Sequence, residues 1–329
     1  MKSSRRNREG LWFDKRLLAG IFVLILCAFP LFVGNPYLMR LAILVFIFSI
    51  LSMSLNLLLG FTGIISLGHA AFFGVGAYAT AVLSTKLHQP FLLVLPVSAI
   101  APTVLALVFG LITLRALKEL YFALAVWGLG EILYAVYVNT GFLGRTNGIG
   151  GIPAPGAAGF TISSDMGFYY LSLVFALVTL VSLELIIVSR IGRAFIAIRE
   201  NETVAGIMGI DALKYQVLSL AVSSFYAGVA GSLYAYYETY ISPGSFTIWE
   251  SIVLVCMVLV GGRQSLLGSA FGALILIAIP ELLRELGEYR MLIYGAIMFL
   301  VIMFRPKGLI PPVYFLKASE RRKHVLAID

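Results

Sequence analysis

Polar side chains inside apolar stretches are the first candidates for chemistry in this sequence. Glu131 lies in the middle of LAVWGLGEILYAV, and Asn56 and His69 lie in two other apolar stretches. A charge at the bilayer centre costs ~2.5–3.5 kcal/mol on insertion scales, so this carboxylate must line a cavity, pair or be protonated. Pairing with a neighbouring helix and lining a substrate path both remain open. We take Asn56, Ser66, His69, Gly74 and Glu131 as candidate residues of a substrate pathway.

The motifs of enzymes and of ATP-binding proteins do not occur in the sequence. There is no G-x-x-x-x-G-K-[ST] phosphate loop, no GxSxG and no HExxH. The three histidines are dispersed, and Cys27 and Cys256 lie in separate apolar runs without metal-ligand spacing. We therefore predict no catalytic residue, no metal site and no cofactor bound by this chain.

A charged segment, residues 189–209 (SRIGRAFIAIRENETVAGIMG), interrupts the apolar runs in the second half of the chain. Its apolar residues are expected to form one side of a short helix, and they are Ala194, Ile198, Val204, Ala205, Ile207 and Met208. Gly206 and Gly209 permit a turn or a close approach. Two interpretations are open: a docking element for a soluble partner, or a solvated loop between two spans.

The elements that position these residues are membrane spans. The 329 residues are 60% apolar and 12% charged, whereas about 25% of a soluble domain is charged. This composition predicts an all-α polytopic membrane protein. Ten apolar runs are expected to cross the bilayer, at residues 17–33, 41–60, 66–83, 91–114, 121–139, 168–188, 215–237, 249–260, 267–286 and 291–304. The third run is expected to be either a full span or a broken, re-entrant one.

Basic residues set the expected orientation. With the N-terminus inside, the cytoplasmic segments include a basic N-tail (1–16), the charged loop 189–214 and a C-tail (305–329), around a transmembrane domain at 17–304. All but five of the 24 Lys and Arg then lie on the cytoplasmic side, as the positive-inside rule requires. The net charge of +8 therefore reflects membrane topology and does not indicate nucleic-acid binding. No separate soluble domain is expected.

Small residues recur at a spacing of four, which places them along one helix face. The rows are Ser66–Ala70–Gly74, Ser224–Gly228–Ser232 and Gly268–Gly272. Ordinary helix packing explains any one row. Their clustering in GIISLGHAAFFGVG, residues 63–76, also favours a close-packed or broken helix beside a pathway.

Several stretches together resemble one family of transport proteins. They are NLLLGFTGIISLGHAAFFGVGAYATA (56–81), YFALAVWGLGEIL (121–133), GRTNGIGGIP (144–153), GRAFIAIRENETVAGIMGI (192–210), AGVAGSLYAYYETYISP (227–243), VLVGGRQSLLGSAFGA (258–273) and FRPKGLIPP (304–312). They resemble the motifs of branched-chain amino acid ABC transporter permeases, on the LivM side of the LivH/LivM family. The resemblance extends over nearly the whole chain from about residue 40. RTNGIGG departs from the family, whose members often have T-G-G-x-x-G there.

The resemblance implies an ABC importer permease of the bacterial inner membrane, with about ten transmembrane helices and a short cytoplasmic coupling helix. It implies a homologous LivH-type permease, two ATP-binding subunits that hold ATP and Mg, and an extracytoplasmic solute-binding protein as partners. It also assigns contact with the ATPase to the loop at 192–210. The candidate coupling residues are Gly192, Arg193, Ala197, Glu200, Asn201, Ala205, Gly206 and Gly209.

The transported molecule stays open at this point. The apolar runs suit an aliphatic amino acid, and permeases for urea and short amides resemble the same family. An ion-coupled secondary transporter and a membrane-embedded enzyme are alternatives from other classes. A secondary transporter works from an ion gradient without an ATPase, and an enzyme turns over its substrate as a lone chain.

Overall fold

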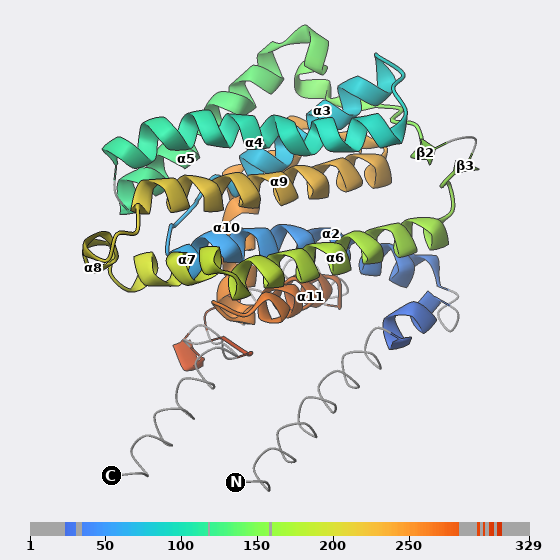
Figure 1. Cartoon of the computed structure of the whole chain (residues 1–329). Helices are drawn as coiled ribbons and strands as arrows, with labels where there is room; N and C mark the ends of the chain where they lie inside the picture. Colours follow the sequence, from blue (N-terminus) through green and yellow to red (C-terminus); the bar gives the residue numbers. More distant parts are fainter. Residues whose placement is uncertain are drawn as a thin grey trace, which may run out of the picture.

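The computed structural model describes residues 24–30, 35–117, 119–157 and 160–282, together with 295, 296, 299, 303–305 and 308–310. The principal helices are α2 (Pro36–Asn56), α3 (His69–Thr85), α4 (Phe91–Ala116), α5 (Glu119–Asn139), α6 (Asp165–Val188), α7 (Arg190–Glu200), α8 (Glu202–Ile207), α9 (Ala212–Glu238), α10 (Ile248–Gly261) and α11 (Leu266–Leu282). Figure 1 shows α3, α4, α5 and α9 on one side of the molecule, and α2, α6 and α11 on the other. The predicted all-α architecture is confirmed for the described part of the chain.

Among the described residues, five helices are long and apolar enough to cross a membrane: α4, α5, α6, α9 and α2 with its continuation to Thr62. α10 and α11 are shorter apolar helices. Several predicted bounds agree closely with the structure, as for α4, expected at 91–114 and found at Phe91–Ala116. The predicted tails, the span at 17–33 and the span at 291–304 lie wholly or mostly outside the described residues.

The predicted third span is interrupted where α2 leads into α3. α2 continues as a π-helix, η1 (Leu57–Thr62), which ends at Gly63 with a φ of +85°. Residues 63–68 are irregular, and α3 begins only at His69. Ser66 therefore lies outside the helix, so the predicted row Ser66–Ala70–Gly74 on one helix face is wrong for its first member. Helix geometry does not extend across the left-handed turn at Gly63.

Glycines set the closest helix crossings of the interior. A Cβ added to Gly231 of α9 would lie 2.2 Å from the carbonyl oxygen of Phe73 in α3. On another side of α9, a Cβ at Gly228 would lie 2.4 Å from the carbonyl oxygen of Ser98 in α4. α9 thus contacts both helices backbone to backbone, which is how helices associate where lipid is as apolar as leucine.

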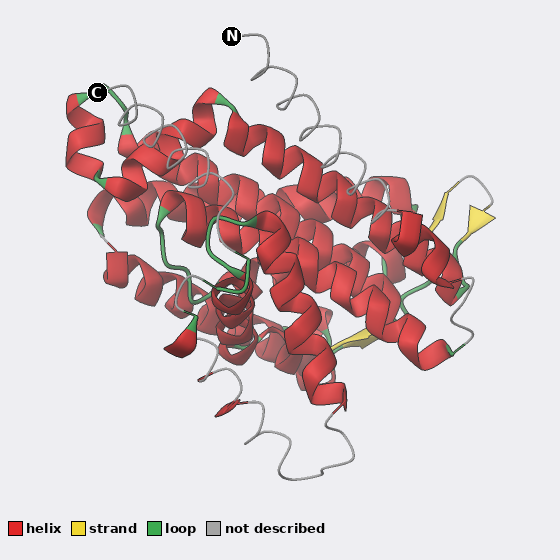
Figure 2. Ribbon diagram, turned by 90° about the horizontal axis from the view of Figure 1, so that it is seen from below, coloured by secondary structure: helices red, strands yellow, loops and turns green. Residues whose placement is uncertain are grey.

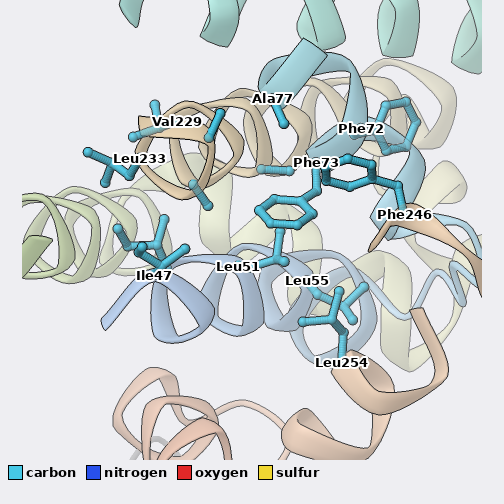
Figure 3. Packing of buried hydrophobic residues seen from close by; sticks show 14 of the residues in the cluster. Ile47, Leu51, Leu55, Phe72, Phe73, Ala77, Val229, Leu233, Phe246 and Leu254 are labelled. Carbon is cyan, nitrogen blue, oxygen red and sulfur yellow. The ribbon is translucent and has the colours of Figure 1, made fainter. Parts of the chain in front are cut away.

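Large apolar side chains fill the space between α2, α3, α9 and α10. Leu51 and Leu55 of α2, Phe73 of α3 and Leu254 of α10 are almost completely buried. Figure 3 shows these side chains directed toward one another, with Phe246 from the turn before α10 beside the α3 phenylalanines. The rings of Phe73 and Phe246 are 5.3 Å apart in an edge-to-face arrangement, which stabilises such contacts.

The two ends of the helix bundle differ in structure. One end, here called the α7–α8 end, carries the two short helices that join α6 to α9 (Figure 1). The other end carries short antiparallel ribbons, β1 (Ile149–Gly150) with β4 (Tyr240–Ile241) and β2 (Gly156–Ala157) with β3 (Phe160–Thr161). Figure 2 shows that strands are a minor part of the fold. The segment between α5 and α6 supplies β1, β2 and β3 at this second end.

Candidate functional site

A pocket of about 210 Å³ lies between the start of α3, the middle of α5 and the start of α10. Its walls include Leu67, Gly68 and Ala71 from the α3 side, Trp127, Glu131 and Tyr134 from α5, and Thr247, Trp249 and Ser251 from the α10 side. Of the five predicted pathway residues, only Glu131 lines it. The structure thus brings the carboxylate to a cavity, one of the alternatives left open by its depth in the span.

Glu131 lies on a side of α5 that the described chain leaves exposed. One turn before it, Trp127 donates its indole Nε1–H to Glu131 Oε1 at 3.1 Å. The spacing of four residues on a helix allows this contact. The indole therefore orients the carboxylate toward the pocket, and an ionised carboxylate there accepts hydrogen bonds from a cation.

The other walls of the pocket are held close to α5 by backbone contacts. A Cβ at Gly68 would lie 2.2 Å from the carbonyl oxygen of Val126, so only glycine permits this approach of the two segments. The N–H of Ala70 donates to Ser251 Oγ at 3.0 Å and ties α3 to α10. α10 begins after Thr247, whose side chain makes no capping hydrogen bond. Uncapped N–H groups at a helix start attract an anion.

Asn56 is fully buried, and its side chain bonds backbone groups of the loop between α10 and α11. Its Nδ2 donates to the carbonyl oxygens of Ser265 at 2.9 Å and Gly262 at 3.4 Å. Its Oδ1 accepts from the N–H of Gln264 at 3.2 Å. The amide therefore clamps this loop onto the end of α2, and its role in a pathway stays a prediction.

The other three predicted pathway residues lie just before α3, as Ser66 does, or within its first two turns, and they do not line the pocket. His69 is buried, and its Nε2 is 3.0 Å from Ser54 Oγ. The Nδ1 of His69 and the hydroxyl of Ser66 are buried and have no hydrogen-bond partner among the described residues. Gly74 makes room for Phe246, since a Cβ there would lie 3.0 Å from the ring.

The predicted coupling segment forms two helices instead of one. α7 begins after Ser189, whose hydroxyl accepts from the N–H of Ile191, and α8 begins after Asn201, whose Oδ1 accepts from the N–H of Val204. These side-chain caps explain the break, because each N-cap residue adopts an extended backbone. α7 buries Gly192, Ala194, Phe195 and Ile198 against the chain.

The apolar residues of α8 point in different directions, which corrects the expected single apolar side. Ala205 is only 3% exposed, so its methyl group packs within its own chain. Val204, Ile207 and Met208 are 54%, 81% and 77% exposed. The two helices meet at an angle set by Asn201, so their apolar sides do not continue one another. The exposed trio, Val204, Ile207 and Met208, is here called the α8 tip.

Most of the other predicted coupling residues of the segment are also open to solvent. Arg193, Glu200 and Asn201 are exposed, and a Cβ at Gly206 or Gly209 would meet nothing within 4 Å. Ala197 is half-buried on α7. The segment thus combines an apolar tip with a charged periphery, as surfaces for protein partners do.

Arg199 was not among the predicted site residues, yet it links α7 to the π-helix. Its Nη1 donates to the carbonyl oxygen of Gly60 at 2.9 Å, and its Nη2 bonds Glu200 Oε1 at 3.1 Å. Burial lowers the pKa of the Arg199 guanidinium, Glu200 raises it and Arg263 lowers it further. The group stays charged at physiological pH. In the sequence, Arg199 is one of several arginines in the charged segment, and nothing there distinguishes it from the others.

Two further pocket residues, Trp127 and Trp249, also escaped the sequence analysis. Trp127 precedes Glu131 by four residues, and this spacing on a helix was the available signal. Trp249 belongs to another helix, and only the tertiary fold brings it to the pocket.

Comparison with known proteins identifies relatives over most of the chain. The family described as the permease component of the branched-chain amino acid transport system matches residues 37–302. The high-affinity branched-chain amino acid transport system permease protein LivM of Escherichia coli (strain K12) is 30% identical, over 92% of this chain and 76% of the relative. LivM of Salmonella typhimurium is similar to the same degree.

A more distant relative carries a different name. The ribose import permease protein RbsC of Haemophilus influenzae is 26% identical over 69% of this chain and 71% of its own length. No solved structure matches the chain. The family match and the LivM identity together show that the chain belongs to the branched-chain amino acid transport permease family, as the multi-pass, non-catalytic permease component of an ABC transport system.

Proposed function

We propose that the chain is one of two homologous permeases in an ATP-driven importer of aliphatic amino acids, and that its α8 tip docks onto an ATP-binding subunit. The partners are a LivH-type permease, two ATP-binding subunits that hold ATP and Mg, and an extracytoplasmic solute-binding protein. The observation that carries the docking proposal is the exposure of Ile207 and Met208, at 81% and 77%, on a helix outside the apolar spans. A contiguous apolar tip on such a segment favours a protein partner over the solvated-loop interpretation.

The distribution of basic residues supports a cytoplasmic α7–α8 end. Among the described residues, that end carries Arg115, Arg190, Arg193, Arg199, Lys214, Arg263 and Arg305, whereas the strand end carries Arg40, Lys86 and Arg145. Lys and Arg are enriched in cytoplasmic segments of membrane proteins. The same rule supports ten spans with both termini inside, and a cytoplasmic position gives the α8 tip access to soluble ATP-binding subunits.

The pocket beside α5 is the proposed passage for the amino acid. Glu131 offers a carboxylate to an ammonium group, and the N-terminus of α10 offers backbone N–H groups to a carboxylate. The walls between them are apolar or aromatic, including Leu67 and Trp249. A zwitterion with an aliphatic side chain matches both features, whereas urea lacks charges to pair with them. Similarity to a ribose permease makes sugar the second candidate to test.

Purification of the intact complex tests this proposal. A tagged chain isolated from its own host membranes should bring two ATP-binding subunits with it. In proteoliposomes with the solute-binding protein, the complex should accumulate radiolabelled leucine only when ATP and Mg are supplied. Uptake driven by an ion gradient without an ATPase, or preferential uptake of ribose or urea, would contradict the proposal.

Substitution in the α8 tip tests the docking surface itself. Ile207→Asp removes an exposed apolar contact worth ~1.5–3 kcal/mol if it becomes buried on docking, so the ATP-binding subunits should be lost from the purified complex. Thr203→Asp places the same charge on an exposed polar residue of α8 and should retain them. Equal recovery of the ATP-binding subunits with both variants would show that the tip is not the docking surface.

A further inference from the structure

We propose that Arg199 is the positioning residue that passes movement of the docked α7–α8 segment to the break between α2 and α3, and so to the pocket wall. This inference rests on the proposed function, because it assumes that an ATP-binding subunit moves α8. It adds a defined mechanical link: the hydrogen bond from Arg199 Nη1 to the carbonyl oxygen of Gly60, at 2.9 Å.

Arg199 sits where movement of the tip reaches the membrane helices first. It belongs to the last turn of α7, two residues before the cap that separates α7 from α8. Its side chain is only 26% exposed, although most of the segment around it is open to solvent. The rest of the α7 interface is apolar, through Phe195 and Ile198. The guanidinium therefore supplies a directional, charged contact, whereas the apolar side chains beside it have no directional preference.

The acceptor side is a π-helix, a form that is rare and often marks functional sites. Gly60 lies near the end of η1. The last carbonyl groups of a helix have no N–H donor in a following turn, so they accept hydrogen bonds from other groups. The arginine stem also packs against the next turn, since a Cβ at Gly63 would lie 2.6 Å from Arg199 Cγ. Gly63 has a φ of +85°, so this position suits glycine for both conformation and space.

The π-helix also contacts the loop between α10 and α11. A Cβ at Gly60 would lie 2.0 Å from Asn56 Oδ1 and 2.8 Å from the backbone nitrogen of Gln264. The last turn of α10, just before that loop, is bonded to residues nearer the C-terminus, since the Leu309 N–H donates to the carbonyl oxygen of Val260 at 2.9 Å. The π-helix therefore contacts both a segment proposed to move and a loop that follows a braced helix end.

Displacement of the π-helix is expected to act on residues 63–68. This irregular stretch follows the π-helix and contains no regular helix hydrogen bonding, so it absorbs displacement more easily than α2 or α3. Leu67 and Gly68 at its end form part of the pocket wall. A pull or push at Gly60 is thus expected to change the pocket through this stretch while the close α3–α9 crossing stays rigid. An element with two arrangements that both sites bias is the requirement for coupling.

A coupling ratio separates this role from simple structural support. In the purified complex reconstituted in proteoliposomes, we would measure leucine transported per ATP hydrolysed for the parent, Arg199→Ala, Arg199→Lys and Arg190→Ala. Arg199→Ala should keep the ATP-binding subunits and hydrolyse ATP, but its ratio should fall at least about tenfold, the size expected for one lost charge-assisted hydrogen bond. Arg199→Lys keeps one charged donor and should restore part of the ratio. Arg190→Ala removes an exposed arginine from the same helix and should match the parent.

A second variant keeps the inference testable if Arg199→Ala does not fold. Gly63→Ala retains the arginine and places a methyl group 2.6 Å from its Cγ, so the ratio should fall in the same way. Gly128→Ala, at a glycine with open space around it, is its control. An unchanged ratio in Arg199→Ala or Gly63→Ala, with a functional parent, would overturn the inference alone. A parent complex without ATP-binding subunits or without ATP-dependent uptake would overturn the proposed function and the inference together.

Discussion

Helices α9 and α5 are both long enough to cross a bilayer, yet they are suited to different neighbours. In the most apolar 18-residue stretch of each helix, 72% of α9 is buried inside the chain, against 28% of α5. α9 buries glycines and serines, including Gly228, Gly231 and Ser223. α5 instead exposes Trp127, Glu131 and other large residues.

The difference shows that helices of one membrane protein are adapted either to neighbours within the chain or to neighbours outside it. Where both partners belong to the chain, small residues bring backbones together, because hydrophobicity alone does not drive association in lipid. Where the partner is lipid, substrate or another subunit, side chains remain large. An exposed carboxylate at Glu131 is costly against lipid, so the α5 side around it is expected to face the pathway and the sister permease. Four pairs of substitutions test this contrast between buried and exposed positions, beginning with the largest expected effect.

Replacing a glycine in the α3–α9 crossing should have the largest effect. A Cβ at Gly231 would lie 2.2 Å from the carbonyl oxygen of Phe73, whereas a Cβ at Gly128 of α5 would meet nothing within 4 Å. Gly231→Leu should therefore abolish folded protein, as measured by size-exclusion chromatography in detergent. Gly128→Leu should be recovered at parental yield. Similar recovery of both variants would remove the distinction between the two helices.

Removing the Asn56 side chain should be the next most damaging change. Asn56→Ala leaves the carbonyl oxygens of Gly262 and Ser265 and the N–H of Gln264 without this partner, and each buried unsatisfied group costs ~1–3 kcal/mol. A clear decrease in the thermal unfolding midpoint in detergent is expected. Asn139 is exposed and donates to the carbonyl oxygen of Ala135 in its own helix. The free energy of unfolding of Asn139→Ala should therefore stay within about 0.5 kcal/mol of the parent's.

Tryptophan at two adjacent positions of α8 should separate folding from docking. Ala205→Trp overfills a buried site at a cost of ~1–3 kcal/mol, so it should destabilise the α7–α8 segment even in the isolated permease. Val204→Trp adds the same bulk at a position that is 54% exposed, and should leave the isolated permease intact. Limited proteolysis of the segment measures the first effect. Equal protease sensitivity of the two variants would contradict the assigned burial.

The smallest effect on stability is expected at Glu131. Glu131→Gln retains an acceptor for the Trp127 indole but loses the charge, and Glu131→Leu loses both. Neither variant should change the free energy of unfolding by more than about 1 kcal/mol, because the hydrogen bond is exposed. Uptake of leucine should instead decrease in both variants if the carboxylate holds the ammonium group. Parental uptake by both would exclude a role in the pathway.

The sequence predicted the bounds of the described membrane helices better than it predicted where a helix changes its form. Apolar runs and basic flanks placed α4, α6 and α9 to within three residues at each end. The π-helix at Leu57–Thr62 was not predicted, because its residues are as apolar as those of the α2 helix before it. The contacts that surround this π-helix, from Arg199 and from the loop at Gln264, come from segments far away in the sequence.

The candidate sites were predicted to a smaller extent. The position of the charged segment was evident from composition, but the side to which Ala205 points was not, since the caps at Ser189 and Asn201 divide the segment into two helices. Glu131 was recognised from its cost in a membrane, whereas its neighbours in the pocket come from three elements far apart in the chain. Periodicity describes one helix at a time and does not report which helices meet.

Photo-cross-linking from the α8 tip tests the central claim most directly. In a chain carrying Cys27→Ala and Cys256→Ala, Ile207→Cys would be labelled with a photoreactive thiol reagent within the assembled complex, and Ile112→Cys on the exposed side of α4 would serve as the control. The account predicts that the probe at position 207 cross-links to an ATP-binding subunit and that the probe at position 112 does not. Absence of that cross-link at position 207, in a complex that still transports leucine, would contradict the assignment of α8 as the docking helix.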